Sequence, residues 1–119
     1  MSFEKGKYGR VLFGRLRPDE DLVAGVEALC LEAGFNHAVI RGSLGSVNHA
    51  TFKVGERIIH VPHLGLEVTA LYGEIREGKA NLTGSVVNGA GEVFSGHFVS
   101  GKNLICVTAE ITLEEWLPE

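Results

Sequence analysis

The stretch that decides the fold runs from residue 17 to residue 34 and reads RPDEDLVAGVEALCLEAG. One of its aspartates can cap the first turn of a helix, and the other acidic residues favour the positive end of the helix dipole. Apolar residues then recur at helical spacing from Leu22 to Ala33, and Gly34 supplies a C-terminal stop. The sequence therefore predicts one amphipathic helix that covers a sheet.

Nearly all of the remaining sequence has the pattern of β-strands. Residues 10–16 precede the helix and residues 38–40 follow it, so these two strands flank one crossover. Asn88-Gly89-Ala90-Gly91 is the clearest hairpin signal, because Asn and Gly tolerate positive φ. The other predicted strands comprise residues 47–53, 57–61, 66–75, 82–87, 92–99 and 103–113. We predict one α+β domain over residues 1–119, with a mainly antiparallel multi-stranded sheet and one principal helix packed on it.

The composition narrows the classes of function. The chain has 119 residues and a formal net charge of −4, whereas a nucleic-acid-binding protein normally carries a basic patch. Direct DNA binding is therefore disfavoured. No apolar run reaches the roughly 18 residues that span a bilayer, and residues 1–7 lack the apolar core of a signal peptide. We expect no membrane contact, a cytoplasmic location, and buried, reduced thiols at Cys30 and Cys106.

Histidines are the residues that suggest a metal site or acid–base chemistry near neutral pH. His60 and His63 form an H-x-x-H pair. Residues three apart on a strand face opposite sides, so both bind one metal only if Pro62 bends the chain. The full set lies at positions 37, 49, 60, 63 and 97.

The other candidate residues each have a possible functional role and a possible purely structural one. His97 lies in Ser95-Gly96-His97-Phe98, where small neighbours let another group approach its ring closely. We expect His37 in a loop and His49 in a strand, each on the surface or hydrogen-bonded. Glu110 fits the solvent-facing side of a half-covered strand, and the alternative is a buried functional carboxylate. The segment Gly42-Ser43-Leu44-Gly45-Ser46 matches no nucleophile or phosphate-binding motif, so its glycines are expected to shape a turn.

Read together, four segments resemble the plants-and-prokaryotes conserved (PPC) domain, in the same order and with similar spacing over nearly the whole chain. They are Arg15-Leu16-Arg17-Pro18-Asp19-Glu20-Asp21-Leu22, Arg41-Gly42-Ser43-Leu44-Gly45-Ser46-Val47, Leu66-Glu67-Val68-Thr69-Ala70-Leu71-Tyr72-Gly73 and Gly91-Glu92-Val93-Phe94-Ser95-Gly96-His97-Phe98. The resemblance implies a compact α+β subunit that assembles as a homotrimer. It also implies a fold similar in outline to acetolactate decarboxylase, a metal-dependent enzyme, but it brings no settled activity.

The resemblance also bears on whether the protein binds DNA. In plants such domains accompany AT-hook motifs in nuclear DNA-associated regulators, and bacterial members are often labelled as DNA-binding proteins on that basis. This chain has no AT-hook, because Gly14-Arg15-Leu16-Arg17-Pro18 interrupts the Arg-Gly-Arg-Pro core with a leucine.

Many prokaryotic members carry an H-x-H strand motif that joins a later Gly-His histidine to bind a metal. The matching positions here are Asn81-Leu82-Thr83, and only His97 of that triad remains. Zinc favours His, Cys and carboxylate ligands, so Asn and Thr are poor substitutes. We therefore expect no metal and no other cofactor.

These observations lead to one hypothesis and one alternative. The leading hypothesis is a PPC-like homotrimeric binding module rather than an enzyme. Its expected partner is a small molecule or a protein, and a DNA-associated or regulatory role is expected only through another molecule. Its candidate ligand or remnant metal-site residues are His97, Asn81, Thr83 and Glu110. The alternative is a small decarboxylase or hydrolase, with zinc or another divalent metal held by His97, His60 and His63.

Overall fold

One helix and eight strands follow each other in the computed structural model, which describes residues 1–62 and 65–119. The first part of the chain contains β1 (Gly6–Leu16), α1 (Leu22–Ala33), β2 (Ala38–Val47), β3 (Ala50–Val54) and β4 (Arg57–Val61). The second part contains β5 (Leu66–Arg76), β6 (Lys79–Val87), β7 (Val93–Phe98) and β8 (Ile105–Pro118). No helix among these described residues is long and apolar enough to cross a membrane.

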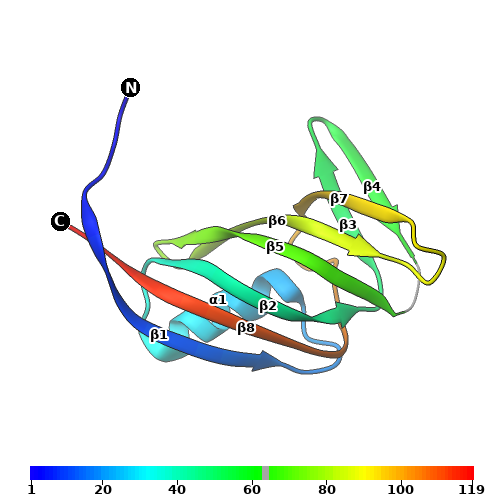
Figure 1. The fold of residues 1–119 in the computed structure, drawn as a ribbon, viewed down its shortest axis with the longest axis horizontal. Helices are drawn as coiled ribbons and strands as arrows, with labels where there is room; N and C mark the ends of the chain where they lie inside the picture. Colours follow the sequence, from blue (N-terminus) through cyan, green and yellow to red (C-terminus); the bar gives the residue numbers. More distant parts are fainter. Residues whose placement is uncertain (63–64) are drawn as a thin grey trace.

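The strands form one sheet in the order β1-β8-β2-β5-β6-β7-β3-β4, and each neighbouring pair is antiparallel. β8 lies between β1 and β2 and is antiparallel to both, so β1 and β2 run in the same direction. The crossover that joins them contains α1, which lies against one face of the sheet (Figure 1). β3, β4 and β7 form the end of the molecule that lies away from the two termini (Figure 1). The predicted α+β architecture is confirmed.

The helix begins and ends as the sequence predicts. Asp21 is the N-cap, and its carboxylate accepts a hydrogen bond from the backbone N–H of Ala24 at 2.9 Å. Gly34 ends the helix in the left-handed conformation, with φ of 75°. The apolar side chains that α1 buries are Leu22, Val23, Val26 and Cys30.

The prediction is wrong in the region of β2. The expected turn at residues 42–46 is the second half of β2, which runs to Val47. Its glycines permit close contact between strands, because a Cβ at Gly45 would overlap the backbone carbonyl of Thr108 on β8. The predicted strand over residues 47–53 is broken, since β3 starts only at Ala50. His49 therefore lies in the loop between β2 and β3 and not in a strand.

Side-chain alternation gives the sheet a face covered by α1 and an opposite face, which we call the open face. Along β8, for example, Ile111 and Leu113 are buried, whereas Glu110 and Thr112, which alternate with them, are only half-buried. The same alternation corrects one prediction about the thiols. Cys30 is buried as expected, but Cys106 is half-buried, because it follows the buried Ile105 and its side chain points away from the core.

Candidate functional site

Three of the predicted site residues come together on the open face. Thr83 of β6 lies directly opposite His97 of β7 in the strand register. Asn81 lies two residues before Thr83 and so points to the same face, opposite Glu74 of β5. On the other side of His97, the register places Lys53 of β3. The positions of the H-x-H motif and the later histidine are thus neighbours in space.

The side chains at this place do not fit a metal ion. The Thr83 hydroxyl donates a hydrogen bond to the backbone carbonyl of Gly96 at 3.0 Å, so it is engaged within the sheet. His97 has a lysine, Lys53, as its register partner, and side chains in such pairs lie about 4.5–5.5 Å apart at Cβ. An ammonium group at that distance repels a divalent cation. His97 remains as the one good zinc ligand among the three, and one imidazole does not make a zinc site.

Glu110 lies far from this cluster within the subunit. It is on β8, in register with Arg15 of β1 on one side and Leu44 of β2 on the other. Four strand spacings separate β8 from β7, which amounts to roughly 19 Å. Glu110 and His97 therefore cannot share a ligand ion within one chain.

The other histidines are also apart from His97. His60 is on the edge strand β4, where its Nδ1 lies 3.0 Å from the hydroxyl of Thr51, and β3 separates β4 from β7. His49 and His60 line one shallow cavity of about 170 Å³. His37 is hydrogen-bonded as expected, since its Nδ1 accepts from the backbone N–H of Glu77 at 3.3 Å. His63 lies outside the described residues. Over residues 1–62 and 65–119, no three His, Cys, Asp or Glu side chains form a set that could hold a metal ion.

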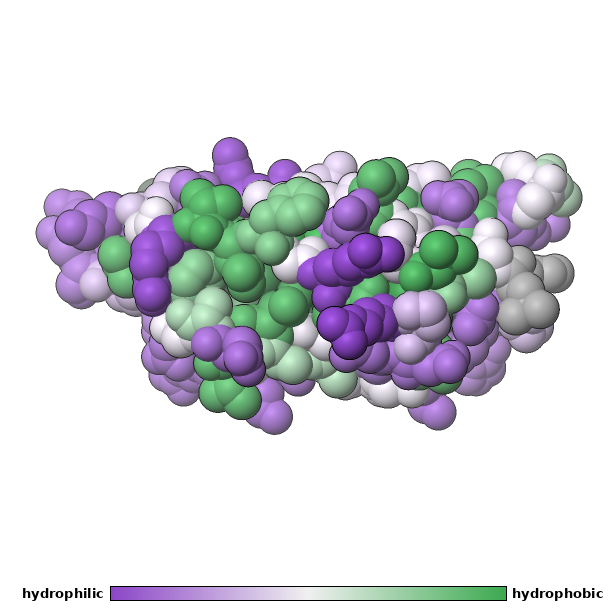
Figure 2. Space-filling model, turned by 90° about the horizontal axis from the view of Figure 1, so that it is seen from below, coloured by the Kyte–Doolittle hydropathy of each residue, from purple (hydrophilic) through white to green (hydrophobic). Residues whose placement is uncertain are grey.

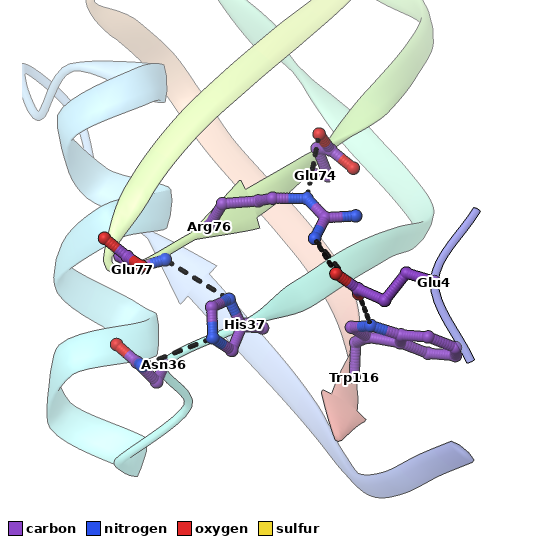
Figure 3. A network of polar contacts seen from close by, with 7 residues as sticks. All are labelled: Glu4, Asn36, His37, Glu74, Arg76, Glu77 and Trp116. Carbon is purple, nitrogen blue, oxygen red and sulfur yellow. Dashed lines mark hydrogen bonds and ion pairs between the residues drawn. The ribbon is translucent and has the colours of Figure 1, made fainter. Parts of the chain in front are cut away.

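A second polar cluster, which the sequence does not predict, lies at the end of the sheet near the chain termini (Figure 3). Arg76 contacts both carboxylate oxygens of Glu4 through Nη1, at 3.1 and 3.2 Å, and its Nε lies 3.2 Å from Glu74. The indole N–H of Trp116 donates to the same Glu4 carboxylate. These residues come from the N-terminal segment, β5 and β8, so no spacing along the chain could have indicated the cluster.

The hydrogen bond from Trp116 is the main reason why the pKa of Glu4 lies below its ordinary value, and Arg76 adds to the effect. Both groups stabilise the ionised carboxylate more than the protonated one. The ionised Glu4 carboxylate thus links the N-terminal segment to Arg76 of β5 and Trp116 of β8.

Several arginines are already engaged by neighbouring groups of the same chain. Arg10 makes a two-point contact with Glu115, with Nε and Nη2 at 3.0 and 3.1 Å from the two carboxylate oxygens. The pKa of Glu115 is lowered, first by the side-chain hydrogen bond from Arg10. Arg41 lies 3.3 Å from Glu114. These contacts reduce the positive charge that the two faces of the sheet offer to a polyanion.

Over residues 1–62 and 65–119, the open face and the single crossover helix define a class of small α+β domain whose sheet is covered by a helix on one side. The chain belongs to the Plants and Prokaryotes Conserved (PCC) domain family, whose model matches residues 3–117. Among curated proteins, none matches the chain.

Solved structures agree with this assignment of the fold. A plant- and prokaryote-conserved protein from Pyrococcus horikoshii is similar with a TM-score of 0.84 and 25% identity, over 100% of this chain and 87% of that one. A protein from Archaeoglobus fulgidus described as metal-containing has a TM-score of 0.82 and 22% identity, over 100% and 88% of the two chains. A protein from Bacteroides thetaiotaomicron, described as a candidate DNA-binding protein, has a TM-score of 0.76 and 18% identity, over 92% and 83%.

The Glu4 cluster can be tested by fluorescence, because Trp116 is the only tryptophan of the chain. Protonation of Glu4 removes the charged acceptor of the indole N–H, so acidification will change the emission with a midpoint below the ordinary pKa of glutamate. The variant Glu4→Gln should lose this transition, whereas Glu56→Gln, in the exposed turn between β3 and β4, should keep it. An unchanged transition in Glu4→Gln would contradict the assignment.

Proposed function

We propose that the protein is a metal-free homotrimeric binding module, assembled through the open face of the sheet. The observation that carries this proposal is a set of large apolar side chains that the single chain leaves in water on that face. Strand register supports their common orientation, since Phe13 pairs with Thr112, Leu44 with Glu110, and Tyr72 with Thr83. The set, with exposed fractions, is Phe13 71%, Tyr72 65%, Leu44 65%, Val93 64% and Val11 63%.

Exposure of this kind favours association. Each Å² of apolar surface removed from water contributes roughly 25 cal/mol, so burying several such side chains per subunit stabilises an oligomer by several kcal/mol. These residues come from β1, β2, β5 and β7 and so extend across most of the sheet. Monomeric proteins rarely leave a wide apolar face uncovered. The resemblance to the PPC family supports a trimer. The exposed apolar side chains support the open face as the surface through which the three subunits meet.

Light scattering tests the assembly. We expect the wild-type protein to have three times the 12.8 kDa mass of the chain at micromolar concentration. Phe13→Asp and Leu44→Asp should give monomers, because each would bury an unpaired carboxylate in the interface. The matched control is Leu31→Asp, which replaces an apolar side chain, 84% exposed, on α1 and should leave the mass unchanged. A wild-type monomer throughout the micromolar range would refute the proposal.

The proposal that the protein binds no metal rests on the residues around His97, which are Asn81, Thr83 and Lys53. Protein purified without a metal-affinity tag should contain much less than one zinc, iron or manganese per chain. The double variant Asn81→His with Thr83→His, in a Lys53→Ala background, should bind zinc by restoring three imidazoles on one face. Stoichiometric metal in the wild type that His97→Ala removes would instead support a metal-dependent decarboxylase or hydrolase, with ligands contributed by different subunits.

Direct DNA binding is not part of the proposed function. Arg10 and Arg41 are paired with Glu115 and Glu114, and the chain carries a net charge of −4. We expect no shift of duplex DNA in a gel at about 50 mM salt, where phosphate contacts are strong. A shift that weakens steeply with added salt, and that is lost when Arg15 and Arg17 are replaced by Ala, would show that DNA contacts are direct.

A further inference from the structure

A cavity of about 490 Å³ lies at the C-terminal end of α1, on the layer of the molecule opposite the open face. That volume is within the usual range for small-molecule sites. Figure 2 views the molecule from the β1 edge and shows apolar side chains gathered in the half that holds the chain termini, where α1 also ends (Figure 1). The residues around the cavity include Glu27, Ala28, Leu31, Phe35, Asn36 and Gly78.

Backbone hydrogen bonds fix the walls of this cavity. Gly34 turns the chain out of the helix, and the N–H of Phe35 donates to the carbonyl of Cys30 at 2.8 Å. The turn between β5 and β6 is held against the same loop, since the N–H of Gly78 donates to the carbonyl of Asn36 at 3.1 Å. The cavity is therefore formed before any ligand arrives, which lowers the ordering cost of binding.

The lining is mainly apolar. The Leu31 side chain, 84% exposed, stands at the rim, and the buried Phe35 ring lies at the wall with the Arg10 guanidinium 4.9 Å from its centroid. Burial, with the nearby Glu27 carboxylate, raises the pKa of the Cys30 thiol to about 11, so the thiol is protonated at neutral pH. A protonated thiol is a poor nucleophile, and the site is suited to reversible binding.

The charge of the site favours a cation. One oxygen of Glu27 accepts the backbone N–H of Ala80 at 2.8 Å, which orients the carboxylate, and among the described residues the other oxygen has no hydrogen-bond donor. The last turn of α1 contains no basic side chain, so the negative end of its dipole is not compensated from within the helix. An ammonium group beside Glu27 would meet the carboxylate, and the negative end of the helix dipole would add to the attraction.

We propose that this cavity binds a small hydrophobic amine, whose ammonium group donates to Glu27 and whose hydrocarbon part lies against Ala28, Leu31 and Phe35. The proposal goes beyond the assembly described above. Because the cavity and the open face are on opposite layers of the subunit, amine binding does not depend on the number of copies.

The test uses 2-phenylethylamine and its neutral analogue 2-phenylethanol, titrated into the intact protein at pH 7 and followed by backbone amide NMR shifts. We expect saturable shifts at residues 27–36 and 78 for the amine. The alcohol should bind about tenfold more weakly, as the loss of one charge-assisted hydrogen bond predicts. Equal affinity for the two compounds, or no saturable binding of the amine up to about 10 mM, would overturn the proposal.

Matched variants locate the two parts of the site. Glu27→Gln keeps an acceptor for the Ala80 N–H but removes the charge, so it should weaken amine binding about tenfold and leave the alcohol unaffected. Glu32→Gln, exposed on the same helix, should change neither. Ala28→Phe should fill the cavity and abolish both, whereas Ala24→Phe, one turn earlier, should not.

The controls also separate this proposal from the proposed assembly. Full amine affinity in Glu27→Gln or in Ala28→Phe would refute the site. Light scattering on the same samples reports the oligomeric state independently, so a trimer without amine binding contradicts only this inference, and a monomer with amine binding contradicts only the assembly.

Discussion

The insertion of β8 between β1 and β2 is the constraint on which the rest of the structure depends. The crossover through α1 makes β1 and β2 parallel, and the space between them is closed only by the antiparallel C-terminal strand. β8 supplies Ile111 and Leu113 to the buried core beneath α1. The last strand of the chain thus completes both the hydrogen bonding of the first strand and the hydrophobic contact that holds the helix.

This arrangement gives the two faces of the sheet different chemical roles. One face is buried under α1, and the cavity beside Glu27 forms where that helix ends. The other face receives alternate side chains of the strands, including Phe13 and Tyr72, and no helix or strand of the described residues lies over it. Assembly and amine binding are therefore proposed for opposite sides of one sheet, and a change at one need not disturb the other.

The cluster around His97 separates what the fold fixes from what the side chains decide. The register of β6 with its neighbours includes backbone hydrogen bonds and places Leu82 in the buried core, whereas Asn81 and Thr83 point to the open face. The similar Archaeoglobus fulgidus structure is described as metal-containing at 22% identity. Fold similarity at that level does not transfer the metal, because ligands are side chains and the fold is specified mainly by the backbone and the core.

The sequence by itself determined the features that depend on local interactions. The helix from Leu22 to Ala33 follows from its cap, its apolar spacing and Gly34, and the β6–β7 hairpin follows from its Asn-Gly turn. Only the tertiary structure decided how far β2 extends, because its second half depends on pairing with β8. The contacts of Glu4 with Arg76 and Trp116 were also decided only by the tertiary structure. It also decided that His97 lies beside Thr83 and Lys53 but far from Glu110. The physical reason is that strand order joins segments that are distant in sequence, and no local spacing encodes which strands become neighbours.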